Sequence, residues 1–282
     1  MSEHETHAVE VVDALRARAR GVRAAIVQMA HDGRTPHVAS ALSCADLLVA
    51  LYFHTMRVDP AVPAAESVDR FIMSKGHGCM AYYATLAARG YFPPALLATY
   101  AQDGSALAEH PGLTGVPGIE VATGSLGHGL AVAAGAALAR SLDRRVGRTF
   151  VLLSDGECDE GSVWEAAMFA AGRHLDQLVA IVDYNKWQAM GRSNEVTALA
   201  PLAAKWEAFG WTTREIDGHD MGAIVTALDA LPFAAGRPST IIAHTVKGKG
   251  VSFMEDDLEW HYRPPSDDDL ARALAEIEGG AR

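Results

Sequence analysis

The stretch VLLSDGECDEGSVWEAA, residues 151–167, decides how the rest of the sequence is interpreted. An apolar run ends at Ser154, and Asp155 and Gly156 follow it directly. Three more acidic residues come within the next four positions: Glu157, Asp159 and Glu160. Like charges this close disfavour one another's ionisation, which is costly at the end of a buried strand. The pattern therefore predicts that a positively charged group belongs at this point.

Length, composition and charge narrow the class of protein. The chain has 282 residues, 49% of them hydrophobic, which is enough for a substantial core. A net charge of −11 without a basic run argues against nucleic acid or an anionic membrane as a partner. Three widely spaced cysteines predict neither a disulfide framework nor a zinc site. The polar N-terminus does not resemble a signal peptide and no apolar stretch is long enough to span a membrane, so we expect a cytoplasmic protein.

Apolar runs and helical repeats alternate along the chain. Apolar residues at three- and four-residue spacing over 11–29 predict an amphipathic helix that ends near Asp32. Continuous apolar strands separated by helices are typical of a parallel sheet covered by helices on both faces. We therefore predict an α/β fold with a doubly wound, mostly parallel sheet, in one domain over residues 1–282. The expected strands are 70–73, 149–153, 178–183, 212–216 and 239–245, and the expected helices include 80–89, 130–142, 162–173, 199–209, 221–231 and a surface helix at about 266–278.

Three local predictions refine this outline. Ser43 is expected to cap the N-terminus of a helix whose apolar face contains Leu47, Leu48 and Leu51. Residues 130–142 are apolar on most faces, which predicts a central buried helix. Residues 104–129 are rich in Gly, Pro, His and Thr without periodicity, which predicts a long functional loop.

Polar residues follow two successive strands at the points where the strands end. Asp155 ends one strand, and Asn185 follows the next. Neighbouring parallel strands end at the same edge of a sheet, so the two side chains are expected to converge there. Carboxylate and amide oxygens suit Mg²⁺ or Ca²⁺, and Mg²⁺ commonly shares its coordination with phosphate. A plain Asp-Gly turn is the alternative, and spacing alone does not separate the two.

SDGE at 154–157 and DYNKWQ at 183–188 are similar to the thiamine diphosphate motif of the transketolase family. The sequence from the first predicted helix as far as GKGVSFMED at 248–256 resembles the N-terminal, diphosphate-binding subunit of split bacterial transketolases. The resemblance implies a thiamine diphosphate-binding fold with Mg²⁺ held by Asp155, Asn185 and the main-chain carbonyl of Trp187. It also places Gly156 at the diphosphate. Glu157 is grouped with the cofactor-binding residues, although its side chain and that of Asp159 are expected to be solvated.

Four histidines lie in segments that resemble site loops of the family. The resemblance implies catalytic or substrate-contacting roles for His37, His77, His110 and His261, with His77 also near the cofactor. Imidazole suits such roles because it exchanges protons near neutral pH. For the other histidines, including His31, His54, His174, His219 and His244, a structural role is expected.

A glycine-rich loop and three lysines complete the expected cofactor site. Gly124, Ser125 and Leu126 resemble the family's loop near the aminopyrimidine. Lys247 is the preferred source of positive charge for a phosphate, with the weaker candidates being Lys75 and Lys249. Four residues differ from those usual at the matching positions of the family, which suggests a specialised substrate: Val38, His128, Ser154 and Tyr262.

The resemblance covers only the first of the three regions of a complete transketolase. It implies a separately encoded pyrimidine-binding subunit in a heterotetramer with two copies of each chain, with interface positions at Glu160 and Glu165. The expected reaction is transfer of a two-carbon ketol unit from a ketose, or its phosphate, to an aldose. The alternatives are a subunit of another thiamine diphosphate enzyme, of the 2-oxo acid decarboxylase or dehydrogenase type, and a non-catalytic subunit that retains the fold.

Overall fold

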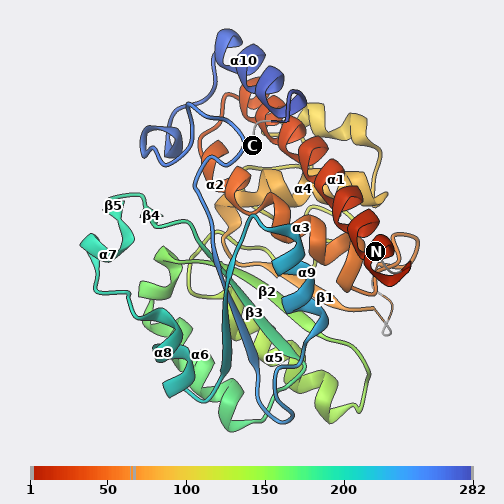
Figure 1. Ribbon diagram of the computed structural model, residues 1–282, viewed down its shortest axis with the longest axis vertical. Helices are drawn as coiled ribbons and strands as arrows, with labels where there is room; N and C mark the ends of the chain where they lie inside the picture. Colours follow the sequence, from red (N-terminus) through yellow and green to blue (C-terminus); the bar gives the residue numbers. More distant parts are fainter. Residues whose placement is uncertain (1–2, 64, 66–67, 281–282) are drawn as a thin grey trace.

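Five parallel strands form the sheet at the centre of the protein, shown as a computed structural model in Figure 1. The structure describes residues 3–63, 65 and 68–280. The spatial order of the strands is β1-β2-β3-β7-β6, and the predicted parallel sheet is confirmed. The strands are β1 (Arg70–Met73), β2 (Thr149–Ser154), β3 (Leu178–Tyr184), β6 (Thr212–Asp217) and β7 (Ser239–His244).

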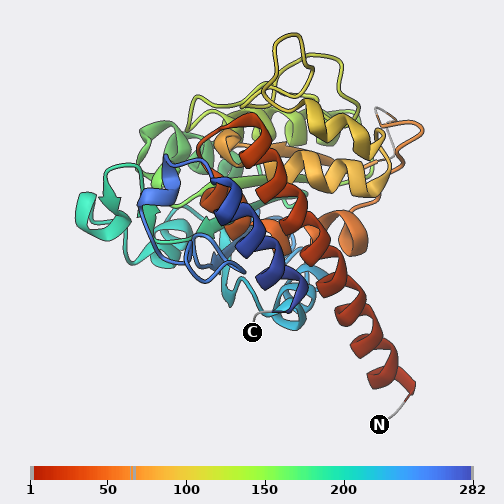
Figure 2. The same ribbon diagram turned by 90° about the horizontal axis from the view of Figure 1, so that it is seen from above.

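Helices cover both faces of the sheet (Figures 1 and 2). Alternate strand residues face opposite ways, as the pleat requires. Phe150 and Leu152 join one core and Val151 and Leu153 the other. The first core is shared with α1 (Glu3–Gly33), α2 (Val38–Ser43), α3 (Ala45–Ala50), α4 (Cys79–Arg89), α9 (Met221–Asp229) and α10 (Asp267–Glu278). The second is shared with α5 (Gly129–Leu142), α6 (Gly161–Gly172) and α8 (Leu202–Ala208).

The order of the strands in the sheet indicates where a ligand site is expected. From β3 the chain forms a hairpin, β4 (Trp187–Gln188) and β5 (Gly191–Arg192), and then α7 (Ser193–Val196) and α8. It next builds β6 at the edge and returns to insert β7 beside β3. Open α/β sheets bind ligands where the strand order switches in this way, outside the carboxyl ends of the strands.

Two local predictions are wrong. Ser43 does not cap a helix: it ends α2, and its hydroxyl donates to the Asp183 carboxylate at 2.6 Å, because that buried anion needs donors more than a helix end does. The helix predicted at 130–142 forms as α5, but it is not buried. Val132 is 43% exposed and Leu142 is 73% exposed, because this chain covers only one side of the helix.

Other boundaries shift slightly. The helix predicted from residue 199 begins at Leu202, after Pro201, and the helix predicted to 231 ends at Asp229. Ser266 caps α10 in a reciprocal pair with Asp269, which confirms the capped surface helix. Loop structure over 104–128 is confirmed. The cysteines Cys44, Cys79 and Cys158 are free and buried. Across the described ranges, no helix combines the length and apolarity that crossing a bilayer demands.

A buried ion pair ties the carboxyl edge of the sheet together. Lys75 follows β1, and its ammonium group pairs with Asp183 near the end of β3; both side chains are fully buried. Lys75 also donates to the Ser40 carbonyl at 2.8 Å, and Asp183 accepts from Ser43 and Thr245. Burial alone would raise the pKa of Asp183, but Lys75 and these hydroxyls outweigh it and hold the pKa below its usual range.

We predict that Lys75→Met strongly destabilises the chain, because the Asp183 carboxylate would remain buried without its cation. Loss of one partner of a buried pair costs about 3–5 kcal/mol of unfolding free energy. Urea unfolding measures the change. Lys205→Met removes an exposed ammonium group whose one hydrogen bond among the described residues is to the Ala198 carbonyl, and it should change stability by less than about 0.5 kcal/mol. Equal stabilities for the two variants would contradict the assignment.

Candidate functional site

A cavity of about 390 Å³ lies outside the carboxyl ends of β2 and β3. We call it the histidine cavity. Its walls come from the loops after β1, β2 and β3, the glycine-rich loop and the segment before α10. Residues that line it include His37, His77, His110, His261, Gly124, Leu126, Ser154, Gly156, Asn185, Trp187, Gln188 and Met190. Many of the residues predicted for the site from sequence therefore meet around one space.

The four predicted histidines form one cluster at this cavity. The His37 ring centre lies 5.0 Å from that of His261, 5.4 Å from that of His77 and 6.2 Å from that of His110. Burial, together with the neighbouring His110, Lys247 and Lys75, lowers the pKa of His37 to about 4. Burial also holds the pKa of His77 well below its usual range. These rings are therefore neutral at pH 7 and can both accept and donate hydrogen bonds.

The backbone at His37 is unusual. Its φ of 72° lies in the left-handed region, which is uncommon for a residue with a side chain. Its N–H donates to the His261 carbonyl at 2.9 Å, so two distant segments hold it in place. Strained backbone that surrounding contacts maintain is typical of functional sites.

Lys247 orients His261. Its ammonium Nζ lies 2.7 Å from His261 Nδ1. An ammonium group has no acceptor, so Nδ1 accepts, and the ring proton of neutral His261 is on Nε2. Burial lowers the pKa of Lys247 to about 8, and burial with the charge of Lys247 lowers that of His261 to about 3. Lys247 is thus a mostly protonated, buried cation in contact with His261 at pH 7.

Asp155 is a buried carboxylate with neutral hydrogen-bond partners. It accepts from the N–H groups of Gly156 (3.0 Å) and Lys186 (2.8 Å) and from the Ser193 hydroxyl (2.7 Å). Burial raises the pKa of Asp155 to about 7; these donors lower it and the charge of Asp183 adds to the rise. A divalent cation beside it would supply the missing positive charge.

The residues present fit such a cation. Register pairs Ser154 with Asp183, so the chain segments that carry Asp155 and Asn185 leave the sheet side by side, as predicted. Asn185 is 3% exposed and lines the histidine cavity. Carboxylate, amide and carbonyl oxygens are hard donors suited to Mg²⁺. Among the described residues, no group of three or more His, Cys, Asp or Glu side chains forms a metal cluster, so a site here would depend on Asn185 and backbone oxygen.

Glu157 is buried, which corrects the expectation that its side chain is solvated. Its carboxylate accepts from the Ser74 hydroxyl, the Gly127 N–H at 2.9 Å and the Ser154 N–H at 3.3 Å. The hydroxyl of Ser154 in turn accepts from the Glu157 N–H at 3.2 Å. Glu157 therefore joins the ends of β1 and β2 to the glycine-rich loop. Asp159 is exposed, as expected.

The glycine-rich loop approaches the site closely. A side chain on Gly124, whose φ is 140°, would place its Cβ 2.9 Å from the His110 ring. One on Gly76 would lie 2.8 Å from the Gly124 nitrogen. Glycine is therefore required where these loops meet. Ser125 lies on the same loop but lines a neighbouring surface cavity instead of the histidine cavity.

Two lysines are not available to a phosphate in the histidine cavity, which corrects the expectation for them. Lys75 is paired with Asp183, and Lys249 lines a different cavity.

The other residues singled out from the sequence lie as follows. Glu160 and Glu165 are exposed, and the side chain of Glu160 makes no capping bond to α6 within the described part of the chain. Tyr262 is 56% exposed and its hydroxyl donates to the Ala189 carbonyl at 3.1 Å. His128 is exposed, whereas Val38 is buried in α2.

Sequence reasoning missed part of the site. Ser193 is fully buried against Asp155, and Gln188 and Met190 of the β4–β5 hairpin line the histidine cavity. Gln188 belongs to the DYNKWQ motif and could have been included from its position. Ser193 has no local signal, because its role depends on how the hairpin returns to the end of β2.

Comparison with known proteins identifies the family. Residues 10–278 match the family described as the thiamine diphosphate binding domain of transketolase. A 6-deoxy-6-sulfo-D-fructose transketolase subunit from a Clostridium species is 46% identical over 242 residues, which cover 86% of this chain and 88% of that relative. An apulose-4-phosphate transketolase subunit from Phocaeicola vulgatus is 41% identical, with 94% of each chain covered.

Solved structures agree with this result. A transketolase from Leishmania mexicana superposes with a TM-score of 0.88 at 28% identity, and the match covers 94% of this chain. The chain spans 41% of that longer enzyme. The predicted resemblance is confirmed, and the chain belongs to the transketolase family, a family of transferases, of which it carries the thiamine diphosphate binding domain.

Proposed function

We propose that this chain is the diphosphate-binding subunit of a cytoplasmic, Mg²⁺-dependent transketolase that transfers a two-carbon ketol unit from a ketose, or its phosphate, to an aldose. One observation carries the proposal: Asp155, whose hydrogen-bond donors are neutral, and Asn185 follow neighbouring strands at the same sheet edge as four clustered histidines, one of which is bonded to Lys247. A diphosphate with its metal and a polyhydroxylated substrate need these two sets of groups next to each other.

Each residue has a role in this proposal. Asp155, Asn185 and the Trp187 carbonyl would hold Mg²⁺, with Ca²⁺ as a substitute, and Gly156 would admit the diphosphate to the backbone. Thiamine diphosphate supplies the carbon nucleophile of the reaction when bound. His37, His77, His110 and His261 would bind substrate hydroxyls and move their protons, and Lys247 would keep the N–H of His261 on Nε2. Glu157 would keep the glycine-rich loop in place.

A separately encoded partner is part of the proposal. Val132 of α5 and Met168 and Phe169 of α6 are 43%, 60% and 41% exposed on the outer helix layer of this chain. Large exposed apolar residues on neighbouring helices favour burial against another chain. We propose that this chain and a pyrimidine-binding subunit form a heterotetramer, with Glu160 and Glu165 at the interface. Departures at Tyr262, His128, Ser154 and Val38 would suit a specialised substrate.

We predict that Asp155→Ala removes Mg²⁺-dependent binding of thiamine diphosphate, because the variant lacks a charged ligand of the metal. The apparent Kd measured by calorimetry with saturating Mg²⁺ should rise by at least about 100-fold. Asp229→Ala removes an exposed carboxylate that pairs with His54 away from the histidine cavity, and it should bind cofactor as the parent does. Unchanged binding by Asp155→Ala would refute the metal assignment.

The neutral histidines predict a loss of stability in acid. His37 and His261 have pKa values of about 4 and about 3 in the folded chain, below the ordinary 6.5. Between these values and 6.5 the unfolded chain binds more protons, so stability is complete above pH 6.5 and falls as the pH is lowered. Each ring should contribute a loss of about 2 kcal/mol between pH 7 and pH 5.

Urea unfolding of the parent and of His261→Gln at pH 7 and pH 5 measures this loss of stability. The variant should lose about 2 kcal/mol less than the parent between the two pH values. His54→Gln alters a histidine that pairs with Asp229 away from the histidine cavity, and it should keep the full loss of the parent. The same acid sensitivity in all three proteins would show that His261 is not held neutral.

Reconstitution tests the partner. We expect this chain and a pyrimidine-binding subunit from the same source to be inactive separately and active together, with a heterotetramer seen by light scattering. Met168→Asp should weaken assembly by about tenfold or more, because a carboxylate would be desolvated at the interface. Val9→Asp, at a 50% exposed position on α1, is the matched control.

Turnover by this chain alone would contradict the proposed division of the enzyme between two chains.

The reconstituted complex of the two chains also tests the substrate. If xylulose 5-phosphate and ribose 5-phosphate reacted as well as any other pair, the substrate would not be a specialised one.

A further inference from the structure

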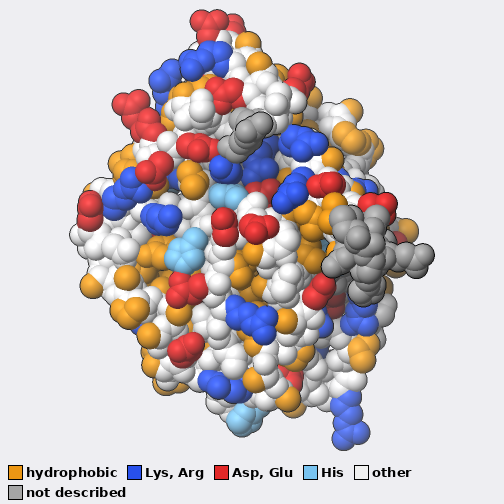
Figure 3. Space-filling model, viewed as in Figure 1, with side chains coloured by type: hydrophobic (Ala, Val, Ile, Leu, Met, Phe, Trp, Pro, Cys, Tyr) orange, Lys and Arg blue, Asp and Glu red, His pale blue; other side chains and the backbone are white. Residues whose placement is uncertain are grey.

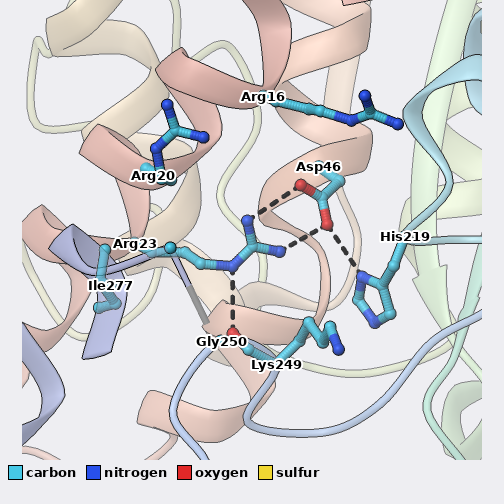
Figure 4. Close-up of a pocket in the computed structure, with 9 residues that line it drawn as sticks. Arg16, Arg20, Arg23, Asp46, His219, Lys249, Gly250 and Ile277 are labelled. Carbon is cyan, nitrogen blue, oxygen red and sulfur yellow. Dashed lines mark hydrogen bonds and ion pairs between the residues drawn. The ribbon is translucent and has the colours of Figure 1, made fainter. Parts of the chain in front are cut away.

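A second cavity lies apart from the histidine cavity and shares no lining residue with it. It measures about 420 Å³ and lies between α1, the C-terminal end of α10 and the loop after β7. On this face of the molecule, Lys and Arg side chains gather beside α1 and below α10 (Figure 3). We call it the basic cavity, and the residues that matter for its chemistry are Arg16, Arg20, Arg23, Asp46, His219 and Lys249 (Figure 4).

The inner wall of the basic cavity is held rigidly. Arg23 and Asp46 form a buried bidentate pair, with Nη1–Oδ1 3.0 Å and Nη2–Oδ2 2.5 Å. Arg23 Nε also donates to the Lys249 carbonyl at 3.0 Å (Figure 4). His219 Nδ1 lies 2.9 Å from Asp46, and its Nε2 accepts from the Val246 N–H, so His219 is a neutral donor to the carboxylate. The one carboxylate among the lining residues is therefore already fully engaged.

Positive charge remains in excess in the basic cavity. Four cationic side chains line it against the single Asp46 carboxylate. Arg16 pairs with exposed Asp13 at 3.2 Å, and Lys249 lies 3.4 Å from Glu255. Neither Asp13 nor Glu255 is among the residues that line the basic cavity. Arg20 has no hydrogen bond or ion pair anywhere in the described chain. Arg16 and Arg20 are four residues apart on one helix, a spacing at which like charges destabilise it.

We propose that the basic cavity binds a small phosphate-bearing metabolite. A phosphate group offers several oxygens to planar guanidinium groups, which bind it in a bidentate manner. Arg20 is free to do so, and Arg23 uses only three of its five N–H groups within the wall. The cavity has the size of a small-molecule site, larger than a bare phosphate, and the apolar side chain of Ile277 offers a surface for an organic substituent.

Phosphate binding tests the site. The melting temperature of the full chain is measured as inorganic phosphate replaces chloride at constant ionic strength. The parent should show a saturable rise. Arg20→Gln should need about tenfold more phosphate for the same rise, because one charged hydrogen-bond donor is lost. Arg16→Gln should act in the same direction.

Arg18→Gln is the matched control. Arg18 lies on α1 two residues before Arg20, but its guanidinium lies over the Phe53 ring, 5.0 Å from the ring centre. This variant should respond to phosphate as the parent does. An equal response by Arg20→Gln and Arg18→Gln would overturn the proposal, because phosphate would then be acting at another site, such as the one that holds a diphosphate. The absence of a saturable rise in the parent would overturn it as well.

Discussion

The buried ion pair between Lys75 and Asp183 is the interaction on which the working edge of this protein depends. It connects the segment after β1 to β3, and through the partners of each group it also reaches α2 and the segment after β7. Because neither side chain meets water, either charge would be very unfavourable without the other. The segments around the site are therefore fixed by electrostatics as well as by packing.

We call Lys75, Asp183 and Thr245, which bond to one another in the buried network, the anchors of this edge. Their spacing in the sequence explains how one edge of the sheet contributes to both the core and the site. Each anchor stands two residues before a residue that lines the histidine cavity or contacts a lining residue: Lys75 precedes His77, Asp183 precedes Asn185, and Thr245 precedes Lys247, which is bonded to His261. The buried layer satisfies its charges internally. In the layer above it, the histidines surround an open cavity, and Asp155 accepts hydrogen bonds from neutral donors.

Much of the fold follows from the sequence because continuous apolar strands such as 149–154 and 178–184 have few alternatives to a covered parallel sheet. The departure of the segments with Asp155 and Asn185 from neighbouring strand ends was also predictable, since neighbouring parallel strands fix where their ends lie. Ser43, Glu157 and Lys75 were not, because each is decided by a buried partner that is distant in sequence or faces inward. The exposure of α5 was missed because an apolar helix looks the same whether its own chain or another covers it.

The uncovered apolar side of α5 and α6 has a consequence for how the protein is made. A chain that displays Val132, Met168 and Phe169 to water is prone to self-association in proportion to its free concentration. Synthesis in excess of whatever covers this surface would therefore raise the load on chaperones and proteases. Under the proposed assembly, the surface would favour production of this chain in amounts balanced with those of its partner, because excess copies would keep these apolar side chains in water.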